Sequence, residues 1–342
     1  MKMTPRNCLA ALAVMAMLVA PGLAQVSLTG AGATFPYPMY SKWFDEYHKL
    51  HPDLQINYQS IGSGGGIRQV TEGTVDFGAT DGPMTDEQLK AFREKRGAGV
   101  LHFPTVLGAV VPIYNVPGIT AELNFTPESL AGIFLGKITK WNDPEIAKAN
   151  PKIKLPGNDI LVVHRSDGSG TTYVWVDFLS KVSEEWKSGV GRNTSVNWPV
   201  GIGGKGNEGV TGQVKQSANS IGYVELIYAA QNKMSYGRVR NRSGAFVKAD
   251  LASVTAAAAG VDMPDDFRVS ITNPAGNSAY PIASFTWLLV PEHMQEGQKM
   301  QAMKGFLKWM LGPGQKQTEA LEYAPLPKAV LGPEEKAIAK LH

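Results

Sequence analysis

The side chains best suited to chemistry lie together in residues 164–171, which read His-Arg-Ser-Asp-Gly-Ser-Gly-Thr. An apolar run at residues 160–163 precedes them and an amphipathic segment at residues 172–187 follows, which predicts a strand, a tight polar loop and the start of a helix. The glycines let the backbone approach a ligand, the hydroxyls and the helix N-terminus supply hydrogen-bonding groups, and Arg165 adds a rigid set of N–H donors. This combination predicts an anion-binding loop.

Thr34 and Phe35 form a second candidate, downstream of a predicted strand at residues 26–28. The apolar residues that follow recur at helical spacing over residues 39–50. Pro36 or Pro38 suits the first turn of that helix, because a missing N–H costs nothing there. Thr34 is therefore expected at a helix N-terminus.

Ser63 and Asp81 are expected near the ends of two further strands. Alternating polarity predicts a strand over residues 54–61, and Ser63 follows in a glycine-rich turn that leads into a short helix from Ile67. A third predicted strand, residues 75–79, places Asp81 near its carboxyl end. In open α/β sheets, ligands bind at that edge.

Three loops that carry Ser or Thr therefore precede helices, at Thr34, Ser63 and residues 169–171. Taken singly, each is more readily explained as an ordinary helix N-cap, because Ser and Thr are favoured at that position. Taken together they favour a shared site, because all three follow strands and the predicted α/β topology brings them to one edge. Helix N-termini that converge there can hold an anion without a metal.

The charged residues of these loops leave two questions open. Arg165 either forms a surface ion pair with Asp167, or is oriented by Asp167 while its remaining N–H groups face a ligand. Asp81 is unexpected in an anion site, because an ionised carboxylate only accepts hydrogen bonds. It becomes useful if the ligand carries a proton, since it then favours a protonated tetrahedral oxyanion over one without a proton.

Other motifs indicate no cofactor, metal or catalytic pair. Residues 201–206 match G-x-G-x-x-G, but Pro199 precedes them and no clear strand surrounds them, so we expect a glycine-rich loop over residues 201–209 rather than a dinucleotide site. His48 and His51 lack further ligands nearby, and His164 is more readily a core residue than a ligand. The sequence contains no metalloprotease, phosphate-loop or serine-hydrolase motif.

Residues 1–24 have the pattern of a secretory signal peptide, with a basic start, an apolar stretch at residues 9–20 and a cleavage site after Ala24. The apolar stretch is too short to span a bilayer. Cys8, the single cysteine, would leave with this segment, so the mature chain is expected to have no disulfide despite an oxidising destination. A bacterial periplasm is the expected location.

Length and charge limit the remaining possibilities. The chain has 342 residues, 43% of them hydrophobic, which is enough for a large core and favours two domains. It carries 33 Lys and Arg against 30 Asp and Glu, and removing Lys2 and Arg6 with the signal peptide leaves 31 against 30. A nearly neutral chain argues against a nucleic-acid partner bound by bulk charge.

Two long apolar segments, residues 101–117 and 279–290, are expected to be strands that cross between two lobes. Lobe I would then combine residues 25–106 with residues 284–342, and lobe II would hold residues 107–283. Strands and helices alternate through both parts, so the expected fold class is α/β, with a mixed β-sheet flanked by helices in each lobe. Such an architecture has a natural hinge.

These motifs together resemble those of the periplasmic phosphate-binding proteins of ABC-type phosphate uptake systems. The resemblance runs from about Leu28 to the Tyr-Ala-Pro-Leu-Pro segment at residues 323–327. The stretches that carry it are Gly30-Ala31-Gly32-Ala33-Thr34-Phe35-Pro36, Gly62-Ser63, Val75-Asp76-Phe77-Gly78-Ala79-Thr80-Asp81, Arg165-Ser166-Asp167-Gly168-Ser169-Gly170-Thr171, Gly203-Gly204-Lys205-Gly206-Asn207 and Ile221-Gly222-Tyr223-Val224.

The resemblance implies a type II periplasmic-binding-protein fold and a set of phosphate ligands. The implied ligands are Thr34, Phe35, Ser63, Asp81, Arg165, Ser169, Gly170 and Thr171. It also implies that Asp81 accepts the proton of the ligand and that Asp167 pairs with Arg165. Thr80 stands where Ser is common in the family and His164 where Arg is common, and neither departure removes an implied ligand contact.

The implied function is high-affinity capture of inorganic phosphate in the periplasm, with arsenate as a second ligand. The protein would act as a monomer without a cofactor, would not be an enzyme, and would deliver its ligand to the permease subunits of an ABC transporter. Two alternatives stay open: a binding protein for another tetrahedral oxyanion such as sulfate or molybdate, and a phosphate-ester hydrolase that uses the same loops.

Overall fold

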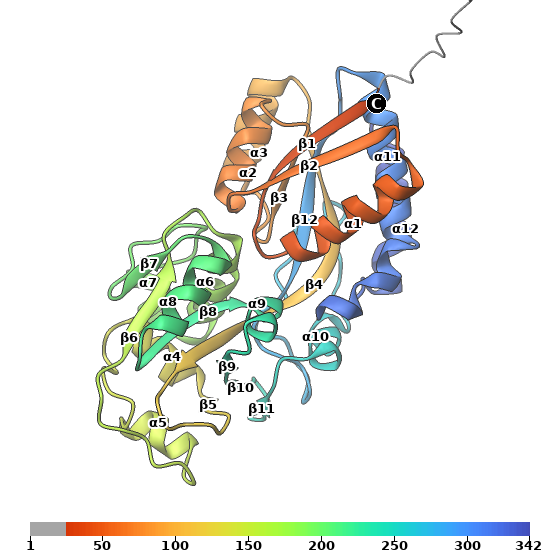
Figure 1. The fold of residues 1–342 in the computed structure, drawn as a ribbon. Helices are drawn as coiled ribbons and strands as arrows, with labels where there is room; N and C mark the ends of the chain where they lie inside the picture. Colours follow the sequence, from red (N-terminus) through yellow and green to blue (C-terminus); the bar gives the residue numbers. More distant parts are fainter. Residues whose placement is uncertain (1–24) are drawn as a thin grey trace, which may run out of the picture.

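The computed structural model describes residues 25–342, so the predicted signal peptide, its cleavage site at Ala24 and Cys8 lie outside the described residues. The chain forms two lobes (Figure 1). Elements from both ends of the sequence build the lobe at the top of the figure, and elements from the middle build the lobe below it. The predicted two-lobe α/β architecture is confirmed.

A single continuous path of strands runs through both lobes. In order across the sheet, the path is β2 (Leu54–Ser60), β1 (Val26–Gly32), β3 (Phe77–Thr80), β12 (Ala283–Pro291), β4 (Val100–Asn115), β8 (Ser220–Glu225), β6 (Leu161–Arg165) and β7 (Ile202–Gly204), with β9 (Ser235–Tyr236) also paired to β4. A smaller sheet joins β11 (Phe246–Val247), β10 (Arg238–Arg240) and β5 (Asn124–Phe125).

The sheet is mixed, as predicted. Strand β1 is parallel to β2 and β3, and β6 is parallel to β7 and β8. Strand β12 is antiparallel to β3 and β4, and β4 is antiparallel to β8. The parallel strands place their carboxyl ends, where the predicted site residues follow, at one edge in each lobe.

Strand β4 links the lobes directly. It is 16 residues long, and its first part pairs with β12 while Val110 to Asn115 pair with β8. The second predicted crossing, residues 279–290, is only partly a strand, because β12 begins at Ala283. The residues before it still bond to the sheet region, since Val110 N donates to Ile282 O over 2.9 Å.

Helices flank both parts of the sheet. They are α1 (Tyr37–Leu50), α2 (Ser63–Glu72), α3 (Asp86–Arg96), α4 (Pro127–Phe134), α5 (Pro144–Ala149), α6 (Gly170–Val182), α7 (Glu184–Gly189), α8 (Gly206–Gln216), α9 (Leu226–Gln231), α10 (Leu251–Ala258), α11 (Gly297–Leu311) and α12 (Lys328–Ile338), with short 3₁₀ helices η1 (Gly314–Gln317) and η2 (Glu319–Leu321). None of the helices within residues 25–342 is long and apolar enough to cross a membrane.

The predicted start of α2 at Ile67 is wrong, because the helix begins at Ser63 and includes three glycines in its first turn. Glycine is unfavourable inside a helix, which is why the sequence indicated a turn. Close packing explains the choice: a Cβ atom at Gly66 would lie 2.5 Å from the carbonyl oxygen of Ala31. Ser63 therefore lies in the helix rather than in a loop before it.

Two other segments differ from prediction. The helix expected over residues 172–187 breaks at Ser183, whose backbone is extended and whose Oγ accepts a hydrogen bond from Trp186 N at the start of α7. The loop expected at residues 201–209 is instead strand β7 followed by helix α8. A Cβ atom at Gly204 would lie 2.7 Å from Val210 N, so this tight strand-to-helix turn needs a glycine.

The C-terminal region also departs from prediction. The sequence predicts C-terminal helices over residues 298–311 and 315–321, and the second is instead two short 3₁₀ helices. The chain then reaches β4, where Leu107 and Ala324 exchange backbone hydrogen bonds. The sequence did not predict α12.

Candidate functional site

Arg165, the last residue of β6, is buried rather than exposed. Its Nε donates to Asp167 Oδ1 over 2.8 Å and its Nη2 donates to Asp167 Oδ2 over 2.5 Å. Its Nη1 donates to Thr171 Oγ1 over 3.2 Å. The interpretation of Arg165 as a surface residue is therefore wrong, because its side chain is 1% exposed. Asp167 holds the guanidinium in one orientation by a bidentate, charge-assisted contact.

Hydrogen bonds and a neighbouring positive charge compensate for the partial burial of the Asp167 carboxylate. Burial alone would raise the pKa of its carboxyl group, but hydrogen bonds and positive charge from Arg165 lower that pKa below its ordinary value. Gly206 N adds a further hydrogen bond to Oδ1 at 3.0 Å. Asp167 is therefore ionised, and its negative charge neutralises most of the charge of Arg165 on this side.

Ser169, Gly170 and Thr171 form the start of α6, as the sequence predicted. Ser169 is the N-cap residue, and its Oγ accepts a hydrogen bond from Thr172 N over 3.0 Å. Gly170 and Thr171 occupy the first helical turn, where backbone N–H groups have no partner within the helix. All three are buried. The helix N-terminus therefore adds partial positive charge beside Arg165.

Thr34 and Phe35 lie in the other lobe, between β1 and α1. Two tyrosines from distant parts of the chain fix their backbone: Tyr228 donates its hydroxyl hydrogen to Thr34 O, and Tyr323 donates to Phe35 O, each over 2.6 Å. One of these tyrosines, Tyr228, lies in the central lobe, so Thr34 is bonded across the two lobes through its carbonyl oxygen as well.

Ser63 and Asp81 lie side by side. Asp81 N donates to Ser63 Oγ over 3.2 Å, and Asp81 Oδ1 accepts a hydrogen bond from Thr286 Oγ1 over 2.7 Å. The second carboxylate oxygen, Oδ2, has no hydrogen-bond partner among residues 25–342 although it is fully buried. A buried polar atom without a partner is rare and costly, so Oδ2 of Asp81 is available to accept a hydrogen from a ligand.

Burial gives Asp81 an unusual pKa. Removal from water raises the pKa of its carboxyl group to about 7, although the hydrogen bond from Thr286 and the positive charge of Arg165 act in the opposite direction. Asp81 therefore exchanges a proton in the pH range where phosphate also does so. Perturbation by burial together with a nearby charge is typical of functional sites.

The structure brings all eight predicted site residues together from both lobes. A Cβ atom at Gly170 would lie 2.4 Å from Asp81 Oδ2 and 2.4 Å from Ser63 Oγ. Gly64 N donates to Gly168 O over 2.9 Å, which is a direct backbone contact between the lobes. Three N-terminal helix regions, one arginine and one carboxylate thus surround the same small region, and this set matches a protonated anion.

Sequence reasoning missed several residues that shape this region. Thr286 lies on β12 and holds Asp81, while Asn207 lies on α8 and touches the hydroxyl groups of both Thr34 and Thr171. Asn207 stood in a recognised motif, Gly203 to Asn207, without a role attached. Only the residue type and that motif were available as signals, because these contacts join residues far apart in the chain.

His164 does not lie fully in the core, as had been expected. It is partly buried and stacks on Trp198 with ring centroids 4.8 Å apart. Burial lowers the pKa of its imidazole. Within residues 25–342, no group of three or more His, Cys, Asp or Glu side chains is placed to hold a metal ion.

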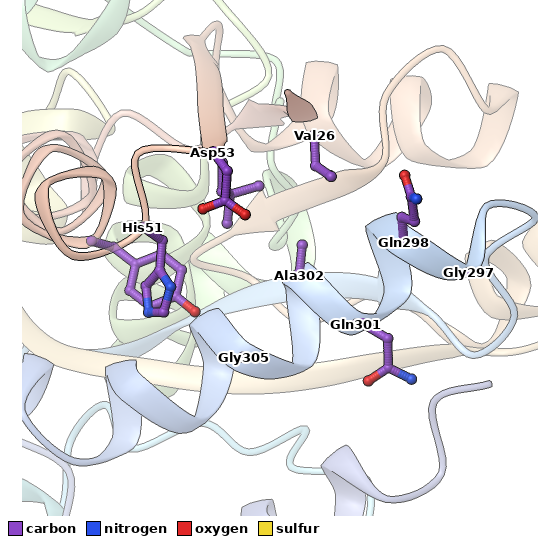
Figure 2. Close-up of a pocket in the computed structure, with 10 residues that line it drawn as sticks. Val26, His51, Asp53, Gly297, Gln298, Gln301, Ala302 and Gly305 are labelled. Carbon is purple, nitrogen blue, oxygen red and sulfur yellow. The ribbon is translucent and has the colours of Figure 1, made fainter. Parts of the chain in front are cut away.

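A surface pocket of about 620 Å³ lies on the other side of lobe I, between the end of α1, the start of β1 and helix α11 (Figure 2). His51 and Asp53 line one wall, and Gln298 and Gln301 project from α11. None of the predicted site residues lines this pocket. Among residues 25–342, the buried polar atoms that lack a partner all lie outside this pocket.

Comparison with known proteins agrees with the fold. A family model described as a PBP superfamily domain matches residues 19–313. The chain therefore belongs to this superfamily of binding proteins, and its fold is the two-lobe, type II form.

Sequence relatives identify the family of this chain within the superfamily. The chain is 48% identical over 305 residues to the phosphate-binding protein PstS of Xylella fastidiosa strain Temecula1, covering 88% of this chain and 82% of that protein. It is 41% identical over 321 residues to PstS of Methanocaldococcus jannaschii, covering 87% and 82%. Within the superfamily, the chain belongs to the PstS family of phosphate-binding proteins.

Solved structures share the same fold. A high-affinity periplasmic phosphate-binding protein bound with phosphate at pH 8.5 has a TM-score of 0.74 at 20% identity, covering 91% of this chain and 93% of that one. A phosphate-binding protein from Stenotrophomonas maltophilia has a TM-score of 0.68 at 20% identity, with the same coverage.

Proposed function

We propose that this protein captures inorganic phosphate between its two lobes and delivers it to the permease of an ABC transporter. The observation that carries the proposal is the pairing, in one buried region, of an oriented arginine, Arg165, with a carboxylate oxygen of Asp81 that the chain leaves without a partner. Membership of the PstS family supports it.

Each site residue has a role in this proposal. Donors to phosphate are the Thr34, Ser63, Ser169 and Thr171 hydroxyls, the Arg165 guanidinium and backbone N–H groups that include those of Phe35 and Gly170. Asp81 is the acceptor, and its Oδ2 atom receives the hydrogen of the ligand. Asp167 does not touch phosphate but keeps Arg165 in place.

Phosphate must give up its hydration to enter this site. Hydrogen bonds to charged groups contribute roughly 1.5–3 kcal/mol each, so a full set of donors offsets that loss without a bound cation. Specificity depends on Asp81. Sulfate has no proton at neutral pH, so its oxygens would meet a carboxylate lone pair with no hydrogen between them, and a site built around one ligand hydrogen can reject its absence by about 10⁴-fold.

Lobe closure follows from the same geometry. We take lobe I as residues 25–106 with residues 284–342 and lobe II as residues 107–283, so the site lies at their junction. Opening would move Arg165 and the start of α6 away from Thr34, Ser63 and Asp81 and expose the anion to water. The protein would act as a monomer in the periplasm, after loss of residues 1–24.

The deciding experiment is calorimetric titration of phosphate-free protein with phosphate, sulfate, molybdate and arsenate. The proposal expects stoichiometric binding of phosphate, weaker binding of arsenate by only a modest factor, and no comparable binding of sulfate or molybdate. Preference for sulfate or molybdate would identify a different oxyanion-binding protein and overturn the proposal.

A hydrolase is the alternative from another class. It predicts turnover of a chromogenic phosphate ester, with or without added divalent metal. The relatives are named as binding proteins, which weighs against it. Stoichiometric phosphate binding without turnover would remove it.

A further inference from the structure

Asn207 connects the two lobes at the site and has no role in the set of phosphate ligands above. It is fully buried, in the first turn of α8 in the central lobe. Its side-chain Nδ2 donates to Thr34 Oγ1 in lobe I over 2.7 Å and to Thr171 Oγ1 in the central lobe over 3.1 Å. One amide group therefore uses both of its hydrogens on two of the proposed phosphate ligands.

The orientation of this amide is fixed from behind. Its Oδ1 atom accepts a hydrogen bond from Glu225 N over 3.0 Å, and a backbone N–H can only donate. The oxygen must therefore face Glu225, and the NH₂ group must face the two threonines. The main chain of Asn207 is held as well, because its carbonyl oxygen accepts from Thr211 Oγ1 over 2.8 Å.

This arrangement sets the direction of both threonine hydroxyls. A hydroxyl oxygen has two lone pairs and one hydrogen. Thr171 Oγ1 receives hydrogen bonds from Asn207 Nδ2 and from Arg165 Nη1, which uses both lone pairs. Thr34 Oγ1 receives one from Asn207 Nδ2 and a longer one, 3.4 Å, from Asn207 N. Each hydroxyl is left with its own hydrogen, which it can only donate.

We propose that Asn207 is a positioning residue that makes the Thr34 and Thr171 hydroxyls hydrogen-bond donors toward phosphate, and that it does so only when the lobes are closed. The inference rests on the proposed function, since it concerns the same site. Hydroxyls that were free to turn would lose orientation entropy on binding an anion, whereas these two are already directed. Because Thr34 belongs to the opposite lobe, the bond from Asn207 to it exists only in the closed form.

A purely structural role for Asn207 predicts something different. Loss of a buried amide would then lower stability, and any loss of phosphate affinity would not depend on whether the two hydroxyls are present. The positioning role predicts a strong dependence on those hydroxyls. A double-mutant cycle separates the two.

The first measurement compares phosphate affinity by calorimetry in the unmodified protein, Asn207→Ala and Asn150→Ala. Asn150 is a matched control, because it is also buried and its amide also bonds on both sides, to Asn124 and Ile146, but far from the site. We expect Asn207→Ala to bind phosphate about 10- to 100-fold more weakly, which corresponds to losing one to two hydrogen bonds of ordinary strength. Asn150→Ala should bind within about threefold of the unmodified protein.

The second measurement repeats Asn207→Ala in a protein that already carries Thr34→Val and Thr171→Val. With no hydroxyls to direct, the additional loss should be less than about threefold. An equal loss in both backgrounds would overturn the positioning role.

A third variant covers the case in which Asn207→Ala fails to fold. Asn207→Asp keeps the shape and the bond from Glu225 N but replaces the NH₂ group by an oxygen that accepts, so both hydroxyls would turn toward it. We expect a loss of phosphate affinity greater than that in Asn207→Ala, and partial recovery as pH falls and the new carboxyl takes up a proton. Phosphate binding as tight as in the unmodified protein would overturn the inference. Failure of the unmodified protein to bind phosphate would instead overturn the proposed function itself, and this inference with it.

Discussion

The two carboxylates at the site, Asp81 and Asp167, have opposite environments in the two lobes. Asp167 uses both oxygens on Arg165, and this contact lowers its pKa. Asp81 uses only Oδ1, and burial raises its pKa to about 7. In the lobe that holds Arg165, both oxygens of the carboxylate are therefore paired within the lobe. In the lobe that holds Asp81, Oδ2 still needs a hydrogen-bond donor, which a ligand can supply. The first explains attraction to an anion, and the second explains a requirement for a protonated one.

The largest expected effect concerns Asp81, whose Oδ2 atom has no hydrogen-bond partner among residues 25–342. Asp81→Asn replaces an acceptor oxygen by a group that can donate, so an unprotonated anion is no longer repelled. We expect the affinity for sulfate relative to phosphate to rise by a factor approaching 10⁴, with phosphate binding itself changed much less. Competitive calorimetry with both anions measures the ratio. An unchanged ratio would show that Asp81 does not select the protonated ligand.

The second largest expected effect concerns Arg165, which pairs with Asp167 in the central lobe. Arg165→Ala removes the main positive charge of the site and leaves the half-buried Asp167 without its partner. We expect phosphate affinity to fall by about 10³-fold, or about 4 kcal/mol. Arg242→Ala, at an exposed position, is the control for loss of one positive charge and should bind as the unmodified protein does. A loss below tenfold in Arg165→Ala would contradict the role of Arg165.

The contrast between the carboxylates also predicts a pH dependence of stability without ligand. An unfolded Asp has a pKa of about 3.9, so a folded value of about 7 means that the folded protein holds its proton more tightly. This contribution is present below pH 4 and is lost as the pH rises through 7. Asp81→Asn avoids the loss, so its advantage in unfolding free energy over the unmodified protein should grow by about 2–3 kcal/mol between pH 5 and pH 8.

Urea unfolding at the two pH values measures this difference. Glu225 and Glu334 are also buried with raised pKa values, but they are present in both proteins and cancel in the comparison. An advantage that stays constant with pH would mean that Asp81 is ionised throughout.

The smallest expected effect concerns the hydrogen bond that Tyr228 donates to Thr34 O. Tyr228→Phe removes the hydrogen bond to Thr34 O while keeping the ring. One hydrogen bond of this kind contributes about 1 kcal/mol, so phosphate affinity should fall about fivefold. Tyr114→Phe, which loses a comparable hydroxyl contact to Ala121 O away from the site, is the control. Equal affinities in the two variants would remove Tyr228 from the site.

The site residues whose positions sequence reasoning predicted share one property: each lies at the end of a strand or shortly after it. Thr34, Ser63, Asp81 and Arg165 could be brought to a common region from strand order alone, because parallel strands end at the same edge. The pairing of Asp167 with Arg165 could also be predicted, because the two residues are only two positions apart in the chain. Local pattern and topology were sufficient for these.

Contacts between distant segments could not be predicted in the same way. Asn207 meets Thr34 across 173 positions, and Thr286 meets Asp81 across 205. Local helix propensity also gave the wrong start for α2. The glycines there disfavour a helix, but close packing against β1 requires them. The break at Ser183 was missed because the apolar spacing continues into α7 while the serine caps a new helix.

Strand β4 has a mechanical consequence for lobe motion. Ala109 pairs with Ala283 of β12, and the next residue, Val110, pairs with Glu225 of β8. One unbroken strand therefore belongs to both halves of the sheet, and it changes partner three residues after the lobe boundary proposed at residue 106. Sliding the lobes apart would break both ladders at once. Twisting the strand between Ala109 and Val110 would instead strain mainly the hydrogen bond from Val110 N to Ile282 O. Because the peptide bond itself is planar, we expect the rotation to use the φ and ψ torsions of Ala109 and Val110, a torsional joint whose stiffness sets how fast the protein opens.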